Sequence, residues 1–166
     1  RLLACLGVLS APSVHAHGGL METQSYTSRR GHPEDQVMGF TRGTLISRDS
    51  GESWRWVCAE AMGYGSWIPE SYVWLSRGEL LTATGKALLR SRDGGCSWAP
   101  SPAFQDAWVS SLAEHPTDDS LLYVATGRPA VTNLLYRSED GGETWTPTPL
   151  RREAVFSTVR VAPSDP

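Results

Sequence analysis

The sequence has little positive charge, almost no lysine and few cysteines. Its 166 residues include 15 basic and 18 acidic side chains, and the formal net charge is −3. We therefore expect no basic field that would attract nucleic acid or an anionic membrane. Lysine occurs once, at Lys86, and the other basic residues are arginines scattered along the chain. We interpret this arginine bias as compositional.

Long apolar runs are also scarce. The run Leu2–Val14 follows Arg1 and is too short and too interrupted to span a bilayer, and no later run is longer. Val14-His15-Ala16 offers the small residues that a signal peptidase reads. We interpret residues 1–16 as a secretory signal peptide without its start, and we expect residues 17–166 to be exported (secreted, periplasmic or at the cell surface). Acylation of Cys5 is the alternative, although the apolar stretch continues past this cysteine.

Cleavage after Ala16 leaves two cysteines, Cys58 and Cys96. Two cysteines in an oxidising compartment often pair but do not have to, so a disulfide and two free thiols both remain open. The histidines have no Glu-x-x-His or paired-cysteine spacing around them, and we expect neither a metal nor another cofactor.

One pattern of eight residues occurs three times: Ser-x-Asp-x-Gly-x-(Ser/Thr)-Trp. The copies begin at residues 47, 91 and 138, so their starts are 44 and 47 residues apart. This is the length of one four-stranded blade of a β-propeller. The looser elements His115-Pro116-Thr117-Asp118 and Ala162-Pro163-Ser164-Asp165 keep the same period of 47. The defining residues are Ser47, Asp49, Gly51 and Trp54; Ser91, Asp93, Gly95 and Trp98; and Ser138, Asp140, Gly142 and Trp145.

Each octet has the residues of a tight β-hairpin. A β-favouring run precedes it, and the Ser/Thr-Trp pair at its end begins another strand. Between them the aspartate can accept hydrogen bonds from backbone N–H groups of the turn, and the glycine supplies the positive φ that closes it. The tryptophan then returns and buries its ring beneath the turn. We therefore expect these aspartates to be structural. One carboxylate in each loop is too few ligands for calcium.

The octet resembles the Asp-box, or BNR, repeat of sialidases, sortilin-type receptors, xyloglucan-degrading propellers and photosystem II assembly factors. This resemblance implies a β-propeller in which the Asp boxes lie at the blade periphery, away from the central ligand face. It is specific for architecture and not for function, because these families share the hairpin and little chemistry.

The expected fold is therefore all-β: a partial propeller of four-stranded antiparallel blades over residues 17–166, with no helix outside the signal peptide. We expect blades over approximately 20–60, 68–102 and 107–150, and the first strand of a fourth within 157–166, at Thr158–Val161. Three blades and one strand do not close a ring of four to eight, so we expect this sequence to be a fragment.

The connection Cys58–Ser71 is the segment least like the repeat. It contains Tyr64 and Trp67, and Tyr72 follows it, with glycines between the aromatic residues. Such a loop can present its rings to a sugar or a peptide. The alternative, which we favour, is that the rings pack between adjacent blades.

These features favour a non-catalytic propeller that serves as a binding or assembly scaffold for an unknown protein or carbohydrate. The alternative is a secreted sialidase-type glycoside hydrolase. It would need an arginine cluster, a tyrosine nucleophile with a glutamate partner, and an acidic aspartate. The Arg-Ile-Pro signature that is usual in the first sialidase blade matches neither residues 29–33 nor residues 41–43, and we identify no catalytic residues. The remaining positions would lie in blades outside this sequence.

Overall fold

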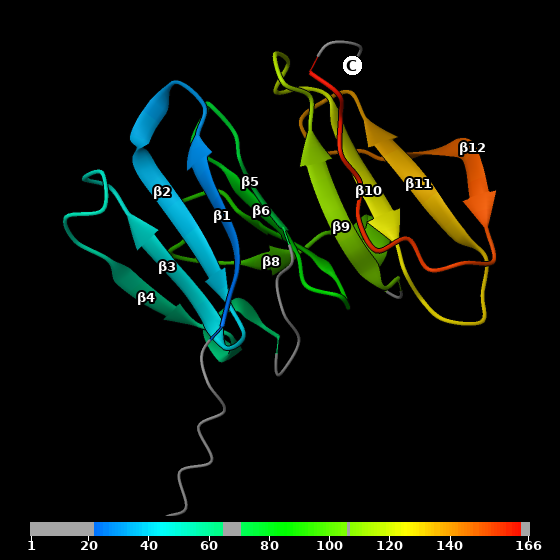
Figure 1. Cartoon of the computed structure of the whole chain (residues 1–166), viewed down its shortest axis with the longest axis horizontal. Helices are drawn as coiled ribbons and strands as arrows, with labels where there is room; N and C mark the ends of the chain where they lie inside the picture. Colours follow the sequence, from blue (N-terminus) through cyan, green and yellow to red (C-terminus); the bar gives the residue numbers. More distant parts are fainter. Residues whose placement is uncertain (1–21, 65–70, 106, 164–166) are drawn as a thin grey trace, which may run out of the picture.

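The computed structural model describes residues 22–64, 71–105 and 107–163. Three four-stranded antiparallel sheets follow one another along this part of the chain (Figure 1). Each sheet contains four consecutive strands in sequence order. The all-β class and the four-stranded antiparallel sheets expected from the sequence are thus confirmed. The segment interpreted as a signal peptide lies outside the described residues.

The three sheets are referred to as blades one, two and three. Blade one comprises β1 (Thr23–Arg29), β2 (His32–Phe40), β3 (Gly43–Ser47) and β4 (Arg55–Cys58). Blade two comprises β5 (Ser71–Trp74), β6 (Leu80–Ala83), β7 (Leu88–Ser91) and β8 (Ala99–Pro100). Blade three comprises β9 (Val109–Glu114), β10 (Leu122–Thr126), β11 (Asn133–Ser138) and β12 (Thr146–Arg152). Two single turns of 3₁₀-helix, η1 (Glu60–Met62) and η2 (Pro102–Phe104), lie after β4 and after β8. No helix in the described part of the chain has the length and apolarity to cross a membrane.

The three blades share one register. The first serine of each octet pairs with the second strand of its blade: Ser47 with Gln36, Ser91 with Leu80, and Ser138 with Leu122. Counting from these pairs identifies equivalent positions in all three sheets. The repeat seen in the sequence is therefore a repeat of strand pairing as well as of turns.

The core lies between neighbouring blades. One buried cluster joins Val37 and Ile46 of blade one to Trp74 and Leu89 of blade two. A second cluster joins blades two and three, and Leu81 and Leu122 are among its fully buried members. Every residue of β5, β6 and β7 is buried. Both faces of blade two are therefore covered, and each blade depends on its neighbours for burial of its apolar surface.

In blades two and three a serine of the first strand bonds the segment that runs beside that strand. Ser25, Ser71 and Ser111 occupy equivalent positions, opposite Gly39, Ala83 and Ala125. The backbone N–H of Leu112 donates to Ser71 Oγ at 2.9 Å. The N–H of Val159, 47 residues further on, donates to Ser111 Oγ at 3.1 Å.

The segment around Val159 thus runs beside β9 as β9 runs beside β5. We expected Thr158–Val161 to be a strand, and in this respect the prediction was wrong: these residues have an irregular backbone. The reason is that no second strand is paired with them among the described residues, so there is no ladder of backbone hydrogen bonds. The chain occupies the position of a blade's first strand without that strand's regular pairing.

The close contact between blades at Gly95 gives a test of the packing. Gly95 has a φ of +92°, and a methyl group there would overlap Cδ1 of Ile46 in blade one. Gly63 has a φ of +82° but open space around its Cα. Gly63→Ala should destabilise the fold by about 1 kcal/mol through backbone strain alone. Gly95→Ala should cost about 3 kcal/mol, because overpacking adds to that strain.

Urea unfolding followed by tryptophan fluorescence measures both losses under the same conditions. Equal losses for the two variants would show that blades one and two do not pack as described.

Candidate functional site

The three Asp boxes are built by one set of hydrogen bonds, shown first by blade one. Ser47 Oγ donates to Asp49 Oδ1 at 2.8 Å and accepts from the N–H of Gly51 at 2.9 Å. Asp49 accepts the N–H of Ser53 on Oδ1 at 2.9 Å and its O–H on Oδ2 at 2.5 Å. The indole N–H of Trp54 closes the turn on the Gly51 carbonyl at 2.9 Å.

The second and third boxes repeat these bonds. Asp93 and Asp140 each accept from the preceding serine of the octet at 2.8 and 2.7 Å. Each also accepts the backbone N–H and the hydroxyl of the residue four positions later. The glycine of each octet has a φ near +90°. Trp145 repeats the indole bond at 3.1 Å, whereas Trp98 has a buried indole nitrogen without a partner among the described residues.

This environment holds the box carboxylates ionised. Hydrogen bonds from Ser53 lower the pKa of Asp49, and hydrogen bonds from Ser97 lower the pKa of Asp93. At Asp140 partial burial opposes ionisation, but the hydroxyl and N–H of Thr144 outweigh it and lower the pKa to about 2. These carboxylates are occupied as acceptors and hold no proton at neutral pH. They therefore suit the structural role expected from the sequence and do not suit general acid catalysis.

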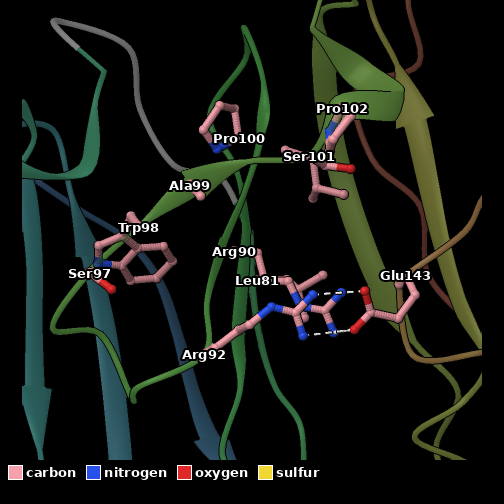
Figure 2. A pocket seen from close by; sticks show the side chains of 12 residues that line it. Leu81, Arg90, Arg92, Ser97, Trp98, Ala99, Pro100, Ser101, Pro102 and Glu143 are labelled. Carbon is pink, nitrogen blue, oxygen red and sulfur yellow. Dashed lines mark hydrogen bonds and ion pairs between the residues drawn. The ribbon is translucent and has the colours of Figure 1, made fainter.

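The boxes also join the blades. Arg48 of blade one donates to the Gly94 carbonyl in the second box at 3.0 Å. Arg90 of blade two donates to the Gly141 carbonyl in the third box at 3.2 Å. Figure 2 shows Arg90 and Arg92 beside Glu143, with Arg92 forming two bonds of 2.8 Å to its carboxylate. The contacts of Arg90 and Arg92 with the third box border a groove of about 330 Å³ between blades two and three. The arginines are scattered along the sequence, but in the structure several of them lie at contacts between blades.

The two described tyrosines at the aromatic connection, Tyr64 and Tyr72, are not presented as exposed rings. Tyr64 and Tyr72 are buried in the core cluster between blades one and two. Burial raises the pKa of Tyr72 to about 12. These two rings thus pack between adjacent blades, the alternative that we favour. Trp67 lies outside the described residues. Cys58, half-buried, and Cys96, exposed, are free thiols in the structure.

The first strands of the blades line a polar cavity of about 410 Å³. We call it the axial pocket, because β1, β5 and β9 lie side by side in the propeller expected from the repeat. Tyr26, Glu114 and Arg160 supply its ionisable side chains at the surface, and Tyr26 is 57% exposed. The described lining residues are Gln24, Ser25, Tyr26, Thr27, Ser71, Tyr72, Val73, Leu112, Ala113, Glu114, Arg160 and Val161.

Glu114, the carboxylate of this lining, is bonded to an arginine that connects three blades. Arg30, after β1, contacts Glu114 at 3.0 Å and Asp119 at 2.6 Å, and it donates to the His115 carbonyl. Asp119 in turn accepts the N–H of Ser76, from blade two, at 2.6 Å. Burial raises the pKa of Glu114, and Arg30 partly offsets this rise. Arg160, by contrast, forms no hydrogen bond or ion pair with the described residues.

Comparison with known proteins agrees with this geometry. The profile of the BNR/Asp-box repeat matches residues 136–147, which include the third box. Among solved structures, an ancestral GH74 enzyme aligns with a TM-score of 0.60 at 19% identity over 82% of this chain. The fold is a BNR-repeat β-propeller. A search of curated protein sequences gives no match.

Two further structures resemble this propeller. The GH74 xyloglucanase from Xanthomonas campestris has a TM-score of 0.57 at 21% identity over 75% of the chain. A structure of YCF48 bound to a D1 peptide has a TM-score of 0.58 at 15% identity over 76% of the chain. The propeller described here spans 19% and 21% of the two GH74 chains and 40% of the YCF48 chain. At these identities the comparisons show the fold alone.

The low pKa of Asp140 predicts a loss of stability in acid. Its folded-state pKa of about 2 is below the ordinary value of 3.8, so the unfolded chain takes up the proton more readily. Ionised Asp140 therefore contributes stability above about pH 4, and this contribution is lost as the pH falls towards about 2. Asp140→Asn should lower the urea midpoint at pH 7 and flatten its decline between these two pH values.

Glu153→Gln is the matched control, because Glu153 is exposed on the same blade and outside the box. This variant should follow the parent protein at every pH. An unchanged acid decline in Asp140→Asn would contradict the assignment of the carboxylate to the turn.

Proposed function

We propose that this chain is part of an exported, non-catalytic propeller that binds its ligand at the axial pocket. The observation that carries the proposal is the composition of that pocket. It combines hydroxyl groups and an amide on the first strands with Arg160, whose guanidinium has no partner among the described residues. A free guanidinium beside polar strands suits recognition of a carboxylate, because it can donate two parallel hydrogen bonds.

The same composition argues against glycoside hydrolysis at this pocket. Most glycosidases flank the scissile bond with two carboxyl groups. The described lining contains one, Glu114, which is already bonded to Arg30. A sialidase-type site would need a tyrosine activated by a carboxylate. Of the two tyrosines in the described lining, Tyr72 is buried in the core, and the exposed Tyr26 has no hydrogen bond to Glu114, which is bonded to Arg30. The GH74 neighbours are enzymes, so a glycoside hydrolase with catalytic residues elsewhere is the second candidate.

A peptide is the ligand class that we favour over a carbohydrate. The YCF48 structure was solved with a D1 peptide, so a propeller of this fold can hold a peptide. In the present chain an extended peptide could pair a side-chain or terminal carboxylate with Arg160 and reach the hydroxyl groups of Tyr26 and Thr27 in β1. Carbohydrate binding would instead depend on exposed rings, and Tyr26 is the exposed ring of this lining.

The proposed export depends on residues 1–16. Expression of the whole protein in a secreting host, followed by mass spectrometry of its N-terminus, should give a mature chain that begins at His17. An intact N-terminus in the cytoplasmic fraction, or a lipid-modified Cys5, would overturn this part of the proposal.

Binding can be tested with a display library of random linear peptides panned against the whole purified protein. We expect enriched peptides to contain acidic residues or to depend on a free C-terminus. Arg160→Ala should weaken the best peptide about tenfold, the typical effect of losing a charged hydrogen bond in a binding site. Arg151→Ala, on the outer strand β12, is the matched control and should bind like the parent protein.

Three outcomes would contradict this function. Failure to enrich any peptide, or equal binding by Arg160→Ala, would remove the axial pocket as a peptide site. Turnover of a fluorogenic sialoside or of xyloglucan by the whole protein would show that the propeller is an enzyme.

A further inference from the structure

The outermost strand of blade one differs from those of blades two and three. These strands are β4, β8 and β12, and each is the last strand at one side of its sheet. In Figure 1, β4 forms the outer margin of blade one. An edge strand presents N–H and C=O groups that can bind a further strand, and proline at such a position removes the N–H donor. The residues whose N–H groups point outwards therefore decide what each edge can bind.

The direction of each N–H group in β4 follows from one hydrogen bond beyond its end. The N–H of Ala59 donates to the Arg42 carbonyl at 3.0 Å, so Ala59 points towards β3. These directions alternate along an antiparallel strand. Val57 therefore also points towards β3, whereas Trp56 and Cys58 point towards the open edge. The N–H groups of Trp56 and Cys58 have no other backbone partner in the described part of the chain.

Blade two has proline at the first of these outward positions. The N–H of Ser101 donates to the Leu88 carbonyl at 2.8 Å, so Ser101 points towards β7 and Pro100 points outwards. Pro100 and Trp56 both lie two residues after the tryptophan of their box. The outward N–H that Trp56 provides in blade one is thus missing from blade two.

The same replacement occurs in blade three and at the second outward position. Pro147 lies two residues after the tryptophan of the third box, and Pro149 follows two residues later, both within β12. Pro102 is the equivalent of Pro149 in blade two, and Cys58 is its equivalent in blade one. Proline therefore occupies both positions in blades two and three. Of the three described blades, blade one alone retains the two outward donors.

Opposite charges flank the edge of β4. Arg55 begins this strand and Glu60 follows its end, and both residues are exposed. A strand added antiparallel to β4 places its C-terminal end beside Arg55 and its N-terminal end beside Glu60. An acidic residue at the first of these ends and a basic residue at the second complement the two charges. Antiparallel addition also continues the pairing of the sheet.

A second copy of the chain is a poorer occupant of this edge. Because the other described edges carry proline, β4 of one copy would pair with β4 of the other. Exchange of bonds between Trp56 and Cys58 would then place Arg55 opposite Ala59, so the flanking charges would stay unmatched. The paired strands have four residues each, whereas a standard protein interface has about 20–30 residues on each side.

We propose that β4 binds an extended segment of a partner protein as a fifth, antiparallel strand of blade one, with an acidic residue beside Arg55 and a basic residue beside Glu60. The N–H and C=O groups of Trp56 and Cys58 bond this strand. The prolines close the same edge in blades two and three and confine strand addition to blade one. This outer edge is separate from the axial pocket, so the two kinds of binding are independent.

The probe for this edge is the peptide Lys-Thr-Val-Thr-Val-Glu, N-methylated at its second, fourth and sixth residues so that it has one hydrogen-bonding edge. Amide hydrogen exchange of the whole protein is followed by NMR. Without the probe, Trp56 and Cys58 should exchange quickly and Val57 slowly. At a concentration ten times its Kd, the probe should slow exchange at Trp56 and Cys58 about tenfold. A control peptide with every N–H methylated should leave both rates unchanged.

Variants test whether proline decides the choice of blade. Cys58→Pro gives blade one the proline of the other blades and should weaken the probe about tenfold, because one backbone donor is lost. Cys58→Ser keeps the N–H and is the matched control, which should bind like the parent protein. Pro147→Thr combined with Pro149→Thr restores the donors of β12 and should create a second binding strand in blade three.

Unchanged exchange at Trp56 and Cys58 in the presence of the probe would overturn the proposal. Equal binding of the probe by the parent protein and a folded Cys58→Pro variant would also overturn it. Should Cys58→Pro not fold, the double variant of β12 replaces it, and the absence of newly protected amides in blade three would be decisive against the proposal. Protection of Trp56 and Cys58 that grows with protein concentration without the probe would show that a second copy covers the edge, which likewise refutes it.

Discussion

The structure depends on the way a serine and an aspartate take over the backbone N–H groups of a tight turn. In a hairpin with two residues of positive φ, several N–H groups point away from the strand ladder, and a buried N–H without an acceptor is costly. Ser47 Oγ and the Asp49 carboxylate accept these groups, and the other two boxes repeat the arrangement. The box side chains thereby satisfy most of the turn, and the N–H of its fourth residue donates to another segment of the same blade, from Ser50 to the Glu34 carbonyl at 3.0 Å and from Gly141 to the Ser120 carbonyl at 2.8 Å.

Because its N–H groups are bonded within its own blade, the turn can be buried against another sheet. The turn glycines have no side chains, so the neighbouring blade approaches their backbone closely, as Leu81 approaches Gly142. The carbonyl of the fourth box residue is not used by the box and accepts from Arg48 at Gly94 and from Arg90 at Gly141. One eight-residue motif therefore folds a hairpin within its own blade and supplies a docking surface to the preceding blade.

The sequence predicts the local part of this arrangement well. The hydrogen bonds of the box span at most four residues, so the spacing of Ser, Asp, Gly and Trp is sufficient to identify the turn. The contacts of Arg48 and Arg90 were not predicted, because they join residues 46 and 51 positions apart and no local pattern marks an arginine that faces the next blade. The burial of Tyr64 and Tyr72 likewise depends on how two blades pack, and the sequence left both alternatives open. The free Arg160 of the axial pocket became visible only when the segment beside β9 was placed in space.

The different roles of the eight box positions also suggest how one blade is distinguished from another. Positions one, three, five, seven and eight hold the turn, and the three copies keep them nearly constant. Positions two and six make no side-chain contact that the turn requires, and they vary: Arg, Arg and Glu at position two, and Glu, Cys and Glu at position six. At the interface between blades two and three these two positions meet, as Arg92 bonds Glu143. Interchangeable blades would stack in any order and onto other copies of the chain. A like-charged pair at this interface would oppose stacking, whereas Arg92 and Glu143 permit it at little cost to the stability of either hairpin.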